Sequence, residues 1–187
     1  MTMSPGLRKF VLAAHITLSV GWIGAVGAYM AFDFTAATGR DAQTLRTAYL
    51  AMERIALSVI VPLAFASLLT GLIVSLGTKW GLFRHYWVLI SLVLTIIATV
   101  VLLVEAQTIT AFADRARDPA TSPAELRALG GTLLHSVGGT LVLLVILVLN
   151  MYKPQGLTRY GWRKQQEERR AAQERSRQGV HDRALQP

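Results

Sequence analysis

The chain has 187 residues, of which 52% are hydrophobic and 16% are charged, and its formal net charge is +8 at pH 7. It contains no cysteine, which excludes disulfides, thiolate metal sites and haem attached covalently through cysteine. Four long apolar segments occupy most of its length, so little sequence is left for a separate soluble domain.

Each apolar segment approaches the roughly 20 residues that a helix needs to cross a hydrocarbon core about 30 Å thick. Because backbone N–H and C=O groups in lipid must pair within the helix, the sequence predicts an all-α bundle of four transmembrane helices. The predicted spans cover residues 7–32, 54–77, 84–110 and 129–152, which together form one domain at residues 1–152.

The first segment follows Arg8 and Lys9, as the apolar part of a secretory signal would. Its apolar run is longer than the roughly 7 to 15 residues of such a signal, so we expect it to remain as the first span. Thirteen of the nineteen Lys and Arg residues lie before the first span, between the second and third, or after the fourth. Lys and Arg mark cytoplasmic segments, so both chain ends are predicted to be cytoplasmic.

The connections carry helix-start and helix-breaking signals. Asp41 is placed to cap a helix that starts outside the membrane and continues into the second span. Pro62 lies inside that span, where its missing N–H and its ring predict a kink about one turn before it. Ser122 and Glu125 match a capping box around Pro123, so the fourth helix is predicted to begin near Pro123 and to protrude from the membrane.

Residues 153–187 form a polar tail with nine Lys and Arg residues and four Asp and Glu residues. We interpret the tail as a partly disordered cytoplasmic segment. Its basic residues next to the membrane would contact anionic lipid headgroups, each contact being worth about 1 kcal/mol. The tail lacks a nucleic-acid recognition pattern, so no nucleic-acid partner is expected.

His15 is a candidate functional residue, because an ionisable group inside a span is costly and is by default a candidate site. It shares a helix face with Ser19, Trp22 and Tyr29. The structural alternative is a neutral His15 that donates to a carbonyl or hydroxyl group on a neighbouring helix.

His135 is the second candidate. Gly131 lies one turn before it and Gly138 and Gly139 one turn after it, on roughly the same helix face. These glycines leave room for a flat macrocycle beside the imidazole, which is a normal axial ligand of haem iron. The alternative is a tight helix crossing with a structural histidine.

Glu105 is predicted to lie within one turn of the depth of His135 and to pair with it. Such a pair can relay protons, hold a metal ligand in one tautomer or neutralise a buried charge. His15 is expected about 18 Å from His135 along the membrane normal, too far for the two to share one haem. The sequence also lacks phosphate-loop and nucleophile-elbow motifs, so nucleotide-dependent and hydrolase functions have no support.

Four segments carry a family resemblance: residues 15–24 (HITLSVGWIG), 69–72 (LTGL), 80–88 (WGLFRHYWV) and 152–156 (YKPQG), the last followed by Tyr160-Gly161. Together, over about residues 5–164, they resemble an uncharacterised family of four-span bacterial membrane proteins that is classed as a domain of unknown function. The resemblance implies a multi-pass protein of the bacterial cytoplasmic membrane and names no activity.

His15, with Trp22 and Gly24 after it, also resembles the first helix of the copper-resistance D type domain and of the haem-containing membrane protoporphyrinogen oxidase. In the oxidase group a histidine of the first helix is associated with haem, which implies a role as haem ligand for His15. The chain has no counterpart of that group's other functional positions, so porphyrinogen oxidation is not implied.

Two functional hypotheses follow. In the first, the protein is a b-type haem or metal-binding redox module, with His15 as inner ligand and His135, supported by Glu105, as outer ligand or proton group. Trp22, Gly131 and Gly139 would support this site. In the second, the protein is a non-catalytic membrane component. It would be a subunit that associates with another membrane protein or with copies of itself, or it would be part of a small-solute transport pathway. In that case His135 and Glu105 line a polar cavity.

Overall fold

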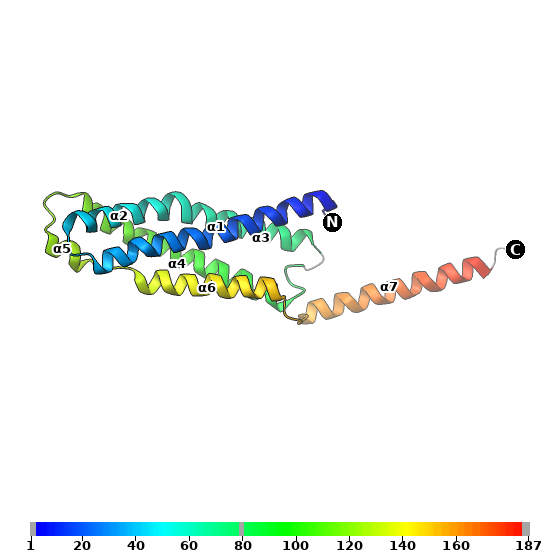
Figure 1. Ribbon diagram of the computed structural model, residues 1–187. Coiled ribbons are helices and arrows are strands. Elements are labelled where there is room, and N and C mark those ends of the chain that lie inside the picture. Colours follow the sequence, from blue (N-terminus) through cyan, green and yellow to red (C-terminus); the bar gives the residue numbers. More distant parts are fainter. Residues whose placement is uncertain (1–2, 79–80, 185–187) are drawn as a thin grey trace.

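A computed structural model of the protein describes residues 3–78 and 81–184. All regular elements in these two ranges are helices, which confirms the all-α prediction (Figure 1). They are α1 (Pro5–Thr38), α2 (Ala42–Ile55), the π-helix η1 (Ala56–Ile60), α3 (Val61–Gly77), α4 (Tyr86–Arg117), α5 (Pro123–Ala128), α6 (Leu133–Tyr152) and α7 (Arg159–Ala184).

Four helical stretches are long and apolar enough to cross a membrane, as expected of a multi-pass membrane protein. They are Pro5–Thr38, Ala42–Gly77, Tyr86–Arg117 and Pro123–Tyr152, and they largely coincide with the predicted spans. Large apolar side chains are exposed on their outer faces, as lipid contact requires. Examples are Ile16, Val20, Leu69, Ile97 and Leu141.

The spans lie side by side and enclose one interior (Figure 1). Both α1 and α4 pack against α2, α3 and α6. We call the end of the bundle that carries α5 the α5 end, and the end from which α7 leaves the α7 end. The largest fully buried side chains lie toward the α5 end, and they include Leu45, Tyr49, Met52 and Leu126.

The predicted helix starts are confirmed. Asp41 caps α2, because its Oδ2 accepts a hydrogen bond from the backbone N–H of Thr44 at 2.8 Å. The capping box also forms: Ser122 Oγ accepts from the N–H of Glu125 at 3.3 Å. In return, Glu125 Oε2 accepts from the N–H of Ser122 at 2.7 Å.

The prediction of one continuous helix from Pro123 is wrong, because α5 ends at Ala128 and α6 begins only at Leu133. The buried Tyr49 hydroxyl shares its hydrogen between the carbonyl oxygens of Leu126, at 3.1 Å, and Gly130, at 2.7 Å. Gly130 has a positive φ of 69°, a conformation that glycine adopts without a steric penalty. This contact from α2 holds the chain in a turn where the apolar pattern alone predicts a helix.

Pro62 distorts its helix at the expected position. The segment one turn before it is the π-helix η1, in which the N–H of Val61 donates to the carbonyl of Ala56. Pro62 has no N–H to donate, and it is the second residue of α3, directly after the π-helix. The α-helix resumes at Val61, directly before Pro62, and the π-helix contributes Ala56 and Ile60 to the interior.

At the α7 end, α7 leaves the bundle as one helix (Figure 1). The chain that precedes it is held by the start of α4. The N–H of Tyr86 donates to the carbonyl of Gly156 at 3.2 Å, and the N–H of Thr158 to that of Arg84 at 3.0 Å. Arg84 also forms an ion pair with Glu168 of α7 at 2.9 Å. Partial disorder of residues 153–187 stays a prediction.

This ion pair is expected to loosen in acid. The Arg84 guanidinium lowers the pKa of the exposed Glu168 from its usual value of 4.5, mainly through its hydrogen bonds. Because the pKa of Glu168 is lowered, the ion pair is fully formed above pH 4.5. It is lost as the pH falls through the lowered pKa. Because the chain lacks cysteine, spin labels at Phe83→Cys and Arg175→Cys can report the distance between α7 and the bundle.

We expect the distribution of label distances to broaden as the pH falls from 7 to about 3, a range that spans the usual pKa of a glutamate. Glu168→Gln should broaden it already at pH 7, and Glu174→Gln, also in α7, should not. A narrow distribution in Glu168→Gln at pH 7 would show that the pair does not position α7.

Candidate functional site

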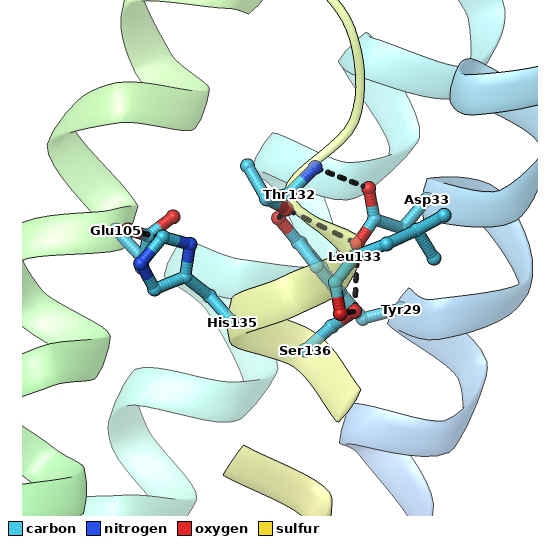
Figure 2. Close-up of polar contacts among 7 residues, drawn as sticks. All are labelled: Tyr29, Asp33, Glu105, Thr132, Leu133, His135 and Ser136. Atoms are coloured by element: carbon cyan, nitrogen blue, oxygen red, sulfur yellow. Dashed lines mark hydrogen bonds and ion pairs between the residues drawn. The ribbon is translucent and has the colours of Figure 1, made fainter. Parts of the chain in front are cut away.

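The predicted pair of Glu105 and His135 is confirmed. His135 lies in the first turn of α6, Glu105 lies in α4, and the two helices pack against each other. His135 Nδ1 is 3.4 Å from Glu105 Oε1 (Figure 2). The histidine side chain is 52% exposed and the glutamate only 18%. Glu105 Oε2 is buried and has no hydrogen-bond partner.

A second carboxylate, Asp33 of α1, lies on the other side of α6 and is fully buried. It accepts hydrogen bonds from the backbone N–H of Thr132 at 2.7 Å, from Thr132 Oγ1 at 3.2 Å and from Ser136 Oγ at 2.7 Å (Figure 2). Since Thr132 Oγ1 donates to Asp33, it accepts from the Tyr29 hydroxyl at 2.9 Å. Asp33 thus caps the start of α6 from a different helix.

Sequence reasoning missed Asp33, which directly follows the predicted first span at residues 7–32. One signal was present: Asp33 lies four residues after Tyr29, so the two share a helix face. Its carboxylate oxygens accept all three of the hydrogen bonds that Thr132 and Ser136 donate.

Gly131 does not leave room beside His135, contrary to one of the two readings of the sequence. A Cβ atom at this position would lie 2.9 Å from Asp33 Oδ1 and 3.2 Å from Ala37 Cβ. Glycine is therefore needed for the close approach of the α5–α6 connection to α1. Gly138 and Gly139 differ, because a Cβ on either would have no heavy atom within 4 Å.

The open space at Gly138 and Gly139 belongs to a cavity of about 260 Å³ between α1, η1, α4 and α6. Tyr29, Glu105, Thr132, His135 and Ser136 make one end polar, and the other lining residues are almost all apolar. Exposed side chains of α4 and α6 line the cavity as well, so it opens between these helices. They are Ile97, Val101 and Leu134.

Trp22 is buried and lines this cavity, whereas His15 does not. His15 lies between α1 and α3, with its Nδ1 3.1 Å from Thr70 Oγ1. Thr70 donates its own hydrogen to the carbonyl of Ala66 at 2.7 Å, so it accepts from His15. On Gly71, a Cβ would lie 2.9 Å from His15 Cε1, which shows how tightly the imidazole packs.

His15 and His135 therefore have different partners, Thr70 and Glu105, in agreement with the predicted difference in their depths. The geometry of His15 matches its structural alternative, a hydrogen bond to a hydroxyl of a neighbouring helix, and its role as a haem ligand stays a prediction. Among the side chains that the structure describes, in residues 3–78 and 81–178, no three His, Cys, Asp or Glu side chains are grouped closely enough to hold a metal ion.

The cavity with its His135–Glu105 end is the candidate functional site. It offers one imidazole, one partly satisfied carboxylate and a long apolar wall. Comparison with protein-family models, with curated proteins and with solved structures gives no match.

Proposed function

We propose that this protein binds one amphiphilic small molecule inside its bundle, as a component of small-solute transport in the bacterial cytoplasmic membrane. The observation that carries the proposal is the cavity, which is apolar along most of its wall and polar at the His135–Glu105 end. Its opening between α4 and α6 would admit a molecule that is dissolved in the lipid. Pockets of this kind, with a few convergent polar groups, are the usual form of a small-molecule site.

The distribution of Lys and Arg supports an orientation with both chain ends in the cytoplasm. The His135–Glu105 end of the cavity would then lie in the outer half of the membrane. The α7 end would lie at the cytoplasmic surface, where the basic residues that follow Tyr152 can contact anionic lipids.

Haem b is a second candidate occupant, and a specific geometry favours it. Glu105 lies beside Nδ1 of His135, so Nε2 would be the nitrogen that holds the haem. Carboxylates commonly orient metal-bound histidines in this way. Bound haem would supply one-electron transfer, while Glu105 would hold the imidazole in one tautomer. The packing of His15 against Gly71 gives it less support as the inner ligand.

Gly139→Leu tests the proposal, because the added side chain would occupy the cavity. The protein is extracted from membranes as polymer-bounded discs that keep their native lipids, and its bound small molecules are identified by mass spectrometry. We expect one amphiphile that is enriched with the wild type and lost with Gly139→Leu. Gly27→Leu is the matched control, because Gly27 is exposed on α1 and a Cβ there also meets no atom within 4 Å.

A visible spectrum of the same discs separates the two occupants. A Soret band that disappears in His135→Ala would make haem the occupant and contradict the primary proposal. No enriched molecule in the wild type, or equal amounts in Gly139→Leu, would mean that the cavity is not a binding site.

A further inference from the structure

We infer, on the basis of the proposed function, that the amphiphile bound in the cavity is a protonated amine, with its ammonium group on Glu105 and its apolar part along α4 and α6. The first reason is the unequal state of the two Glu105 oxygens. Oε1 has His135 Nδ1 at 3.4 Å, whereas Oε2 is buried without a partner. A buried carboxylate oxygen without a donor or a positive charge is energetically costly. An ammonium N–H provides both.

The second reason is the charge around the polar end of the cavity. The titratable side chains that line it are Tyr29, Glu105 and His135, and no Lys or Arg occurs among the described residues of its wall. Asp33 lies directly behind two of the wall residues, Thr132 and Ser136, which both donate to it (Figure 2). Two carboxylates, Glu105 in the wall and Asp33 behind it, thus lie at this end against one imidazole, so the field there favours a cation and opposes an anion.

The third reason is the aromatic surface opposite α4. Trp22 and Tyr29 both come from α1 and both line the cavity. The faces of such rings attract ammonium groups, and the attraction is stronger where water is excluded. The rest of the wall is largely apolar, with residues such as Val26, Leu102 and Val142, so an alkyl or aryl body suits the remaining space.

The test compares three probes that have the same chain and differ in the head group: decylamine, decanol and decanoate. Decylamine is protonated at pH 7, as a lysine amine is. Binding to the full-length protein is measured by native mass spectrometry from an uncharged detergent. We expect decylamine to bind with a stoichiometry of one, about tenfold or more tightly than decanol, and decanoate to bind most weakly. This comparison uses only the wild type and does not depend on the folding of a variant.

Glu105→Gln keeps the shape of the side chain and removes its charge. We expect it to reduce the affinity for decylamine by about tenfold or more and to leave decanol unchanged. Glu174→Gln, in the exposed tail helix, is the matched control and should change neither.

The outcomes distinguish the two levels of the proposal. If decylamine and decanol bind equally, or if Glu105→Gln leaves decylamine binding unchanged, the cavity binds amphiphiles without preferring amines and only this inference is wrong. If no probe binds, or if Gly139→Leu does not prevent binding, the proposed function is contradicted as well.

Discussion

Asp33→Leu is expected to lower the free energy of unfolding by about 2 to 3 kcal/mol. The substitution removes the acceptor of three hydrogen bonds and leaves the buried N–H of Thr132 without a partner. Each buried donor that loses its partner costs about 1 to 3 kcal/mol, and hydrogen bonds between helices in membranes lie at the lower end of such values. Unfolding in mild detergent with increasing dodecyl sulfate, followed by circular dichroism, measures the change.

Asp33→Asn keeps one acceptor and should lose about half as much stability. Asp114→Leu is the control, because Asp114 is 66% exposed and pairs with the nearby Arg117, so its loss should cost no more than about 1 kcal/mol. Equal effects of Asp33→Leu and Asp114→Leu would show that Asp33 does not hold the start of α6 to α1.

Tyr49→Ala is expected to lower the free energy of unfolding by about 3 to 5 kcal/mol, at least as much as Asp33→Leu does. Tyr49 is fully buried near the α5 end, and its ring meets that of Phe112 edge to face, with centroids 5.8 Å apart. The alanine variant loses the ring contacts and also the hydrogen bonds to Leu126 and Gly130. The same detergent titration applies.

Tyr49→Phe separates the two contributions, since it removes only the hydroxyl and should cost about 1 kcal/mol. Tyr152→Ala is the matched control: Tyr152 is 80% exposed, and its loss should change stability by less than about 0.5 kcal/mol. If Tyr49→Ala resembled Tyr152→Ala, the break between α5 and α6 would not depend on this contact.

Half of the candidate site could be predicted from the sequence. Glu105 and His135 come from different predicted spans, and the position of a residue within its span predicts its depth at about 1.5 Å per residue. Depth alone was enough to predict that these two residues meet and that His15 does not join them. It could not predict which way the glycines face, because that depends on the rotation of α6 about its axis.

Local chemistry accounts for what the sequence determined by itself: the four spans, the caps at Asp41 and Ser122, and the distortion before Pro62. In each case the cause lies within a few residues of its effect, as an apolar run, a side chain that reaches its own helix start, or a missing N–H.

The tertiary structure decided the rest. The break at Gly130 requires Tyr49 of another helix, and Gly131 is needed because Asp33 and Ala37 of α1 lie against it. The cavity exists because α1, η1, α4 and α6 leave space opposite Gly138 and Gly139. Such contacts join residues far apart in the chain, and their geometry is set by how the helices pack.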